Sequence, residues 1–300
     1  MSYKKFGIDI SKYQKGIDFS KLAADGVEFI ILRCAYHLGK DTQFEDFYKK
    51  AKAKKIPVGV YLYTTAKSVS EAQAEAEFLI KDVLKGKQLE LPVYYDIEED
   101  FYYSRPKKQN SELVKAFCDT MEKNGYFAGV YASKNFFDTY LDDSMLTNYA
   151  HWVAQWSKSC TYKNKEILGM WQFGGETNAI RSNKVAGYVC DQNYMYEDYP
   201  KIIKDNSLNG YGTVKTAQPK FTGTFKKGDT GIGVYLLKQN LMLLKDAGII
   251  TQAVNDDDIF GDGTQTAVKQ LQKAAGIGQD GVAGAKTIPA IRKLLKTKIL

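Results

Sequence analysis

The 300-residue sequence has few residues of the kind that bind metal ions through nitrogen or sulfur. It contains only two histidines and four cysteines, which are His37, His151, Cys34, Cys118, Cys160 and Cys190. No two cysteines form a C-x-x-C pair, the spacing typical of a zinc site. We therefore expect no metal and no other cofactor. Scattered cysteines in apolar runs are typically buried free thiols, so we expect folding in a reducing compartment.

Long apolar runs and basic clusters are also missing. No stretch approaches the roughly 18 consecutive apolar residues of a membrane-spanning helix, and no apolar signal region precedes the first predicted strand. The formal net charge is +7 and the sequence pI is about 8.9, yet Lys and Arg form no run that would follow a phosphate backbone. We expect no nucleic acid partner and no membrane insertion, whereas an anionic cell-wall polymer is compatible with the charge.

The sequence does contain a regular succession of predicted strands and helices. Eight short apolar runs are typical of β-strands, at 6–10, 29–35, 57–63, 92–98, 127–133, 151–156, 167–173 and 189–194. Helical patterns lie between the early strands, at 18–24, 44–54, 70–84, 111–123 and 134–141. The later strands have little helical sequence between them. We predict the α/β class, with an irregular β/α barrel of eight strands and about five helices.

A second region with a different composition follows. Residues 206–223 are polar and lack helical or strand periodicity, so they are predicted to link a first domain at 1–205 to a second at 224–300. From residue 220 onward, 12 Lys and Arg residues and 7 Asp residues, with no Glu, give a net charge of +5.

Three helical patterns are readable in this second domain, at 234–246, 264–275 and 285–296. Two similar segments, 257–264 and 280–287, share an Asp, a hydrophobic residue, a Gly and a Thr in that order. This similarity suggests an internal repeat within a small three-helix domain.

The strand predicted at 92–98 ends in two carboxylates, Asp96 and Glu98. Residues two apart in a strand point to the same face, so these side chains would lie side by side. Neighbouring carboxyl groups push their pKa values apart, and one can stay protonated while the other is ionised, as glycoside hydrolysis requires. A lone D-x-E is more often an acidic strand end at the surface, so the interpretation depends on the remaining residues.

Two further acids are predicted at strand ends, Asp9 after Phe6-Gly7-Ile8 in the first strand and Asp191 after Val189-Cys190 in the last. The first and eighth strands are neighbours in a closed barrel, so Asp9 and Asp191 would face each other across its mouth. Four carboxylates at one mouth repel one another, and this cost in stability indicates a functional site. We therefore predict Asp9, Asp96, Glu98 and Asp191 as the catalytic residues.

Seven short segments carry a family resemblance: Gly7-Ile8-Asp9-Ile10-Ser11, Gly59-Val60-Tyr61-Leu62-Tyr63, Tyr95-Asp96-Ile97-Glu98, Gly129-Val130-Tyr131, Trp152-Val153-Ala154-Gln155-Trp156, Trp171-Gln172-Phe173 and Asp191-Gln192-Asn193. Through them the first 200 or so residues resemble the glycoside hydrolase family 25 lysozymes, which are N-acetylmuramidases that cleave peptidoglycan. The second strand departs from the Lys-Ala-Thr that this family often carries, with Arg33-Cys34-Ala35 in its place.

The resemblance implies that Glu98 donates a proton to the glycosidic oxygen and that Asp96 is its ionised partner. The acetamido group of the substrate would attack the anomeric carbon, with retention of configuration. Asp9 and Asp191 would be flanking acids that keep the pKa of Glu98 raised. The residues predicted to bind the sugar are Tyr61, Tyr63, Tyr131, Trp156 and Gln172, although strand alternation alone does not say whether Tyr61 or Leu62 faces inward.

The last quarter resembles the type 1 peptidoglycan-binding domain. The matching segments are Gly228-Asp229-Thr230-Gly231, Leu237-Lys238-Gln239-Asn240-Leu241, Phe260-Gly261-Asp262-Gly263-Thr264, Ala267-Val268-Lys269-Gln270-Leu271-Gln272 and Asp280-Gly281-Val282-Ala283-Gly284. The implied partner is bacterial peptidoglycan, and tethering to it would raise the local concentration of the barrel at its substrate.

Two other functions are compatible with parts of the pattern. Family 18 chitinases also end a barrel strand in D-x-E, but their longer D-x-x-D-x-D-x-E is absent before Glu98. A binding protein with an inactive barrel would require the loss of an acid, and none is lost. The expected setting is an endolysin made in the cytoplasm of a bacterial host and released to the wall through membrane holes, with a bacterial autolysin as the alternative. No oligomeric state is indicated.

Overall fold

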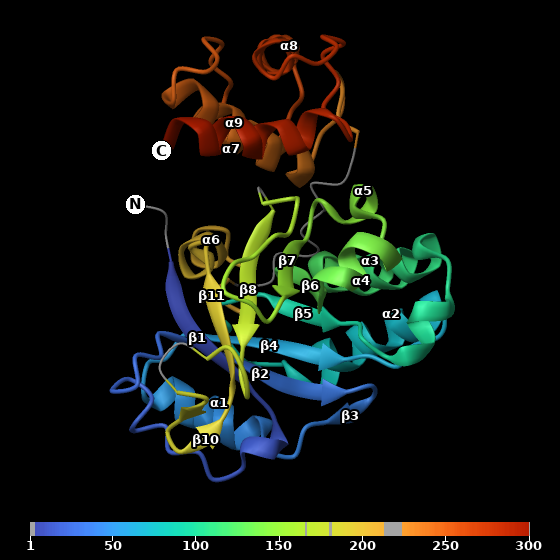
Figure 1. The fold of residues 1–300 in the computed structure, drawn as a ribbon. Helices are drawn as coiled ribbons and strands as arrows, with labels where there is room; N and C mark the ends of the chain where they lie inside the picture. The colour runs from blue at the N-terminus through green and yellow to red at the C-terminus, as the bar shows by residue number, and fades with distance from the viewer. Residues whose placement is uncertain (1–3, 166, 180–181, 213–223, 300) are drawn as a thin grey trace. The chain divides into compact units, whose positions relative to one another are not determined.

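The computed structural model of the chain describes residues 4–165, 167–179, 182–212 and 224–299 (Figure 1). These residues form two compact units, one over 4–212 and one over 224–299. None of the helices in these ranges has the length and apolar composition needed to cross a membrane.

The first unit is built on a closed sheet of eight strands, namely β1 (Lys5–Ile10), β2 (Phe29–Tyr36), β4 (Val58–Tyr63), β5 (Val93–Asp96), β6 (Ala128–Ser133), β7 (Ala150–Ala154), β8 (Leu168–Gly174) and β11 (Asp191–Met195). The strands from β1 to β8 pair in parallel, whereas β11 runs antiparallel to both of its neighbours, β8 and β1. Because β1 also pairs with β2, the sheet closes, and the predicted β/α barrel is confirmed. Short strands β3 (Gly39–Lys40), β9 (Lys184–Val185) and β10 (Tyr188–Val189) complete the set.

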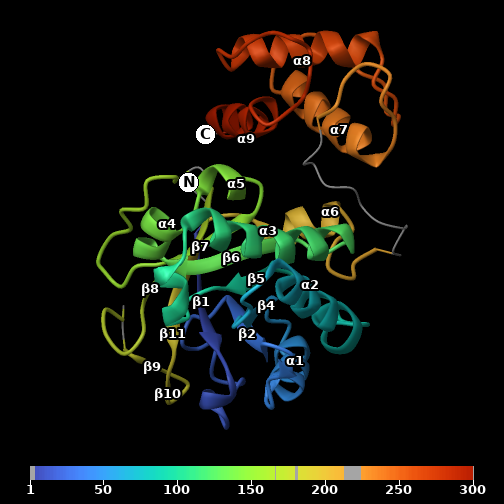
Figure 2. The same cartoon turned by 90° about the vertical axis from the view of Figure 1, so that its right-hand side faces the viewer.

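Helices cover only part of the barrel. They are α1 (Phe44–Ala53), α2 (Val69–Phe78, continued by a π-helical turn at Leu79–Val83), α3 (Lys107–Lys123), α4 (Lys134–Tyr140), α5 (Asp143–Leu146) and α6 (Tyr199–Asp205). Figure 2 shows α1, α2 and α3 following one another along one side of the barrel. The apolar residues of these helices recur at helical spacing, as in Phe44, Phe47 and Ala51 of α1, and they are buried against the outer face of the strands.

The interior of the barrel is filled by aromatic side chains around Trp152. The rings of Tyr131, Tyr94 and Tyr61 lie 4.5, 5.1 and 6.0 Å from the Trp152 ring, centroid to centroid. Room for them depends on Gly129, because a Cβ at this position would lie 2.6 Å from the Tyr94 ring and 2.7 Å from the Ala150 carbonyl oxygen. Tyr61 therefore faces inward, and the sequence alternation left this open.

Two local predictions are wrong. The segment 18–24 forms turns and no helix, because the Asp18 carboxylate accepts hydrogen bonds from the backbone and hydroxyl of Ser20 at 2.9 and 2.6 Å and competes with helical bonding. The helix predicted from Ser111 begins four residues earlier, at Lys107. Ser111 lies inside α3, where its hydroxyl bonds the Lys107 carbonyl and accepts from Asp142.

The segment predicted as a linker begins in contact with the barrel. Its residues 206–212 are described, and residues 213–223 lie outside the described residues. Asn209 is fully buried and connects the residues that precede β6 and β5. Its side-chain amide accepts from the Phe127 backbone N–H at 2.7 Å and donates to the Leu91 carbonyl at 2.8 Å. The Tyr211 hydroxyl bonds the Glu90 carboxylate. These residues are therefore part of the packed barrel unit.

The second unit consists of α7 (Ile232–Asp246), α8 (Asp262–Ala274) and α9 (Thr287–Ile299) around an apolar core, as predicted for a small three-helix domain. Its two repeated segments are each held by a side chain from the preceding helix. Lys238 of α7 bonds Asp257 and the Ile259 carbonyl, and Gln272 of α8 bonds Asp280 at 2.6 Å and the Val282 carbonyl at 3.0 Å. The repeat thus has a shared structural basis.

Candidate active site

The strand register gathers polar side chains at one end of the barrel. Asp96 is the last residue of β5, and its partners across the sheet are Tyr63 on β4 and Tyr131 on β6. The strand predicted to reach Glu98 ends at Asp96, so Glu98 is carried by the loop that follows. Its neighbour Ile97 is fully buried and donates its backbone N–H to the Tyr131 carbonyl at 3.1 Å, and this contact fixes the start of the loop.

Asp9 and Asp191 are opposite each other across paired strands. Asp9 lies near the end of β1, and its register partner is Asp191 on β11. Asp191 was predicted two residues into a strand at 189–194, but it is the first residue of β11, which runs antiparallel to its neighbours. The start of an antiparallel strand lies at the same edge as the ends of parallel strands, so Asp191 still reaches the mouth.

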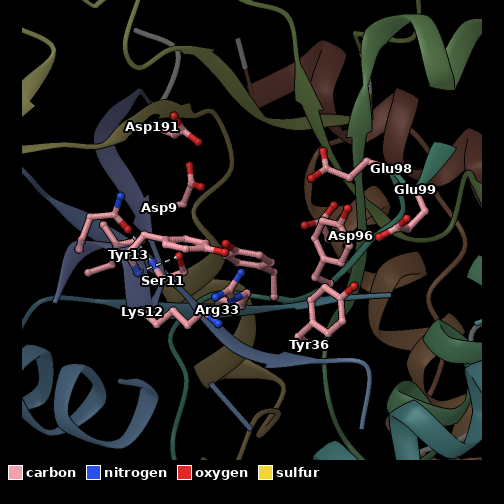
Figure 3. Close-up of a pocket in the computed structure, with 14 residues that line it drawn as sticks. Asp9, Ser11, Lys12, Tyr13, Arg33, Tyr36, Asp96, Glu98, Glu99 and Asp191 are labelled. Atoms are coloured by element: carbon pink, nitrogen blue, oxygen red, sulfur yellow. Dashed lines mark hydrogen bonds between the residues drawn. The ribbon is translucent and has the colours of Figure 1, made fainter. Parts of the chain in front are cut away.

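These residues line a cleft of about 640 Å³. Its lining consists of Asp9, Ile10, Ser11, Lys12, Tyr13, Gln14, Arg33, Tyr36, Tyr61, Tyr63, Asp96, Glu98, Glu99 and Asp191. Figure 3 shows Asp9 and Asp191 on one side of the cleft and Asp96, Glu98 and Glu99 on the other. The four predicted acids are therefore brought together, and Glu99 is a fifth carboxylate that was not predicted.

Asp9 is a buried carboxylate held by two amides. It is 8% exposed, and one of its oxygens accepts from Asn193 Nδ2 at 2.7 Å and from Gln172 Nε2 at 3.1 Å. Burial is the largest influence on its pKa and raises it, the two amide hydrogen bonds lower it, and the charge of Glu98 raises it. The resulting pKa of Asp9 is about 6.

Asp96 is buried without such donors. It is 3% exposed, and its Oδ1 has no hydrogen-bond partner within the described part of the chain. Burial raises the pKa of Asp96 well above its ordinary value, and the charges of Glu98 and Asp9 raise it further, whereas the charge of Arg33 lowers it.

The pKa values of the other two acids are raised as well. For Glu98 the cause is burial of the carboxyl group in the cleft, followed by the charges of Asp191 and Glu99. For Asp191, burial and the charge of Asp9 raise the pKa to about 8. A raised pKa lets a carboxyl group keep its proton to a higher pH, so the cleft can supply a general acid.

The five residues predicted to bind sugar fall into two groups. Tyr61 and Tyr63 line the cleft, as predicted. Gln172 is only 3% exposed, and its Oε1 accepts from the Tyr131 hydroxyl and from Trp156 Nε1, both at 3.0 Å. The same amide donates to Asp9. Gln172, Tyr131 and Trp156 are therefore the second group: they are not part of the cleft lining but are linked to Asp9 by hydrogen bonds.

Some cleft residues were missed by the sequence reasoning. Tyr13 is 74% exposed, and Tyr36 stacks on Tyr63 with ring centroids 5.1 Å apart and an interplanar angle of 11°. Arg33 projects into the cleft from β2. The alternation of inward positions, with Arg33 two residues after the inward Ile31, is the signal that could have identified it.

Comparisons with known proteins agree with this geometry. The family model described as Glycosyl hydrolases family 25 matches residues 8–180, and the model described as a peptidoglycan binding domain matches residues 230–291. The autolytic lysozyme of Clostridium acetobutylicum is 25% identical over 290 residues, which cover 96% of this chain and 79% of that protein.

Solved structures with the same fold include the modular autolysin LytC from Streptococcus pneumoniae, with a TM-score of 0.57 and 26% identity. The match covers 65% of this chain but only 47% of LytC. The catalytic domain of endolysin ply40 from bacteriophage P40 of Listeria monocytogenes has a TM-score of 0.54 and 21% identity, over 68% of this chain and 98% of that domain. The chain belongs to family 25 of the glycosyl hydrolases and carries a peptidoglycan binding domain after its barrel.

Proposed function

We propose that the barrel hydrolyses the β-1,4 bond between N-acetylmuramic acid and N-acetylglucosamine in bacterial peptidoglycan. The observation that carries the proposal is the pairing of Asp96 with Glu98 in an open acidic cleft at the end of β5. Membership of family 25 and the similarity to an autolytic lysozyme support this substrate.

In this proposal Glu98 is the general acid. It is the more exposed member of the pair, and its raised pKa favours the protonated form that can pass a proton to the leaving oxygen. Asp96 would act in its ionised form beside the anomeric centre and stabilise the positive charge that develops as the glycosidic bond breaks.

The detailed route that we propose is substrate-assisted and retaining. The acetamido oxygen of the sugar would attack the anomeric carbon while Glu98 protonates the departing oxygen, and Asp96 would orient the acetamido group. Water would then open the cyclic intermediate, with Glu98 accepting its proton. Proton NMR of the first product formed should show the β-anomer before mutarotation.

The second domain would keep the enzyme on its substrate. Its net charge of +4 over residues 224–300 favours an anionic wall, and the matched domain type supports peptidoglycan as the partner. Binding of both parts to one polymer would raise the effective concentration of cleavable bonds near the cleft.

For the biological setting we propose an endolysin that is made in the cytoplasm of a bacterial host and reaches the wall after membrane pores open. The similarity to a phage endolysin domain supports this setting, and the similarity to an autolytic lysozyme supports an autolysin as the alternative. Expression in a bacterium should cause lysis only when a pore-forming protein is made with it. Lysis without the pore would contradict the endolysin setting.

The test of the activity is the identity of the new ends. Purified peptidoglycan digested by the protein is reduced with borohydride and analysed by mass spectrometry. A muramidase gives reduced muramic acid at the new ends, whereas reduced glucosamine would contradict the proposal. Glu98→Gln, treated in parallel, should release few fragments, because an amide cannot donate the required proton.

A further inference from the structure

The cleft holds two cations beside its five carboxylates. They are Lys12, whose side chain is exposed, and Arg33, which is 9% exposed. A charge with so little access to water is not screened as an exposed lysine is, and Arg33 is the cation that lowers the pKa of buried Asp96. Figure 3 shows it between the Asp9 side and the Asp96 side of the cleft.

The guanidinium of Arg33 is fixed by Asp41. Arg33 Nε donates to Asp41 Oδ2 at 2.8 Å. Asp41 is itself held, since the backbone N–H groups of Lys12 and Gln43 donate to its two oxygens at 3.1 and 2.9 Å. The Tyr13 ring lies 5.2 Å from the guanidinium carbon. Within the described part of the chain, only Nε of this guanidinium has a hydrogen-bond partner, so its two terminal nitrogens stay available to the cleft.

The two buried acids, Asp9 and Asp96, are compensated in different ways. Ionised Asp9 is stabilised by hydrogen bonds from Asn193 and Gln172. Asp96 has no comparable donor at Oδ1, so an ionised Asp96 depends on a nearby positive charge. Arg33 is the buried cation that shares the cleft with it.

We propose that Arg33, clamped by Asp41, is a positioning residue that supplies the positive charge needed by ionised Asp96 in the reaction proposed above. This inference rests on the proposed function. The negative charge of Asp41 offsets only part of the effect, because Asp41 lies outside the cleft lining that Arg33 and Asp96 share.

The charge of Arg33 acts on the pKa of Asp96 in the direction that this role requires, against a net upward shift. Its burial and the charges of Glu98 and Asp9 oppose ionisation, and Arg33 favours it. The charged and titratable groups that share the cleft or act on Asp96 from the surrounding elements are Asp9 on β1, Lys12 and Tyr13 after β1, Arg33 and Tyr36 on β2, Tyr61 and Tyr63 on β4, Glu98 and Glu99 after β5, Tyr131 on β6 and Asp191 on β11. Apart from exposed Lys12, Arg33 is the cation among them.

The experiment measures kcat and KM against pH for the full chain on soluble peptidoglycan fragments. Arg33→Met removes the charge and keeps an unbranched apolar stem, and Arg33→Lys keeps the charge. Loss of the cation raises the pKa of Asp96, so the acid limb of the kcat/KM profile should move to higher pH by about one unit or more in Arg33→Met. Arg33→Lys should show little of this shift, because it keeps the positive charge.

A control for folding is the double variant Arg33→Met/Asp41→Asn, because Arg33→Met alone leaves the Asp41 anion buried without its partner. The double variant should show the same upward shift of the acid limb. An unchanged acid limb in both variants, with only KM raised, would overturn the proposal and make Arg33 a substrate contact. If the wild-type protein releases no fragments, the proposed function itself fails, and the Arg33 proposal fails with it.

Discussion

Replacing Asn193 with alanine tests whether the site depends on the amide that supports Asp9. Asn193 is fully buried, donates to Asp9 at 2.7 Å and accepts from Trp152 Nε1 at 2.8 Å. The substitution leaves the Trp152 N–H without an acceptor, which costs about 1–3 kcal/mol. It also removes a hydrogen bond to a charged group, which contributes about 1.5–3 kcal/mol when the carboxylate is ionised.

The cost of losing the hydrogen bond to Asp9 depends on pH. Burial raises the pKa of Asp9 to about 6, above an unfolded value near 3.9, so this carboxyl stabilises the folded state at low pH and loses that contribution as pH rises through about 6. The hydrogen bond from Asn193 lowers the pKa, so the alanine variant raises it further. We expect Asn193→Ala to lose about 1–2 kcal/mol more stability near pH 7.5 than near pH 5.

Urea denaturation at the two pH values measures this difference. Asn124→Ala is the matched control, because Asn124 is exposed and its amide bonds only the Thr120 carbonyl one turn back in the described structure. The control should change stability by less than about 0.5 kcal/mol at both pH values. If Asn193→Ala cost the same near pH 5 and near pH 7.5, its coupling to the Asp9 charge would be refuted.

Three further predictions concern stability and binding. A barrel ending at residue 212 should melt at a higher temperature than one ending at residue 205, because the shorter form loses Asn209 and its hydrogen bonds to Phe127 and Leu91. Equal melting temperatures in calorimetry would contradict this. Gly129→Ala should lower the free energy of unfolding by about 1–3 kcal/mol through contact with the Tyr94 ring, as measured by urea denaturation, and no loss would show that the interior has room. Residues 224–300 alone should sediment with purified peptidoglycan and lose only part of the binding as salt rises, because screening weakens the attraction from their net charge of +4 more than it weakens pocket contacts. No binding at low salt would refute a wall-binding role.

Much of the barrel could be predicted from the sequence, because strands and helices give strong periodic patterns of apolar residues. The placement of Asp9, Asp96 and Asp191 followed from counting strand ends, and the paired register of Asp9 and Asp191 agrees with it. The direction of β11 could not be predicted, because the residue pattern of a strand is the same in a parallel and in an antiparallel pairing. Asp191 nevertheless lies at the mouth of the barrel, because it is the first residue of β11.

The hydrogen bonds made by buried polar side chains could not be predicted from the sequence. Gln172 bonds Asp9, Tyr131 and Trp156, which come from three other parts of the chain. Asn209 looked like a linker residue, because a polar segment rich in Gly and Asn has the composition of a loop whether or not it is packed. Partners that are distant in sequence become visible only when the fold brings them together.

The measurement that tests the central claim most directly compares leaving groups. Glu98→Gln should lose at least about a hundredfold in turnover on peptidoglycan, where the departing sugar needs a proton. On an aryl glycoside of the same sugar, whose phenolate leaves without protonation, the variant should keep most of the wild-type rate of bond cleavage, while Asp96→Asn should be slow on both substrates. Equal losses of Glu98→Gln on the two substrates, or near-normal turnover on peptidoglycan, would contradict the assignment of Glu98 as the general acid of this cleft.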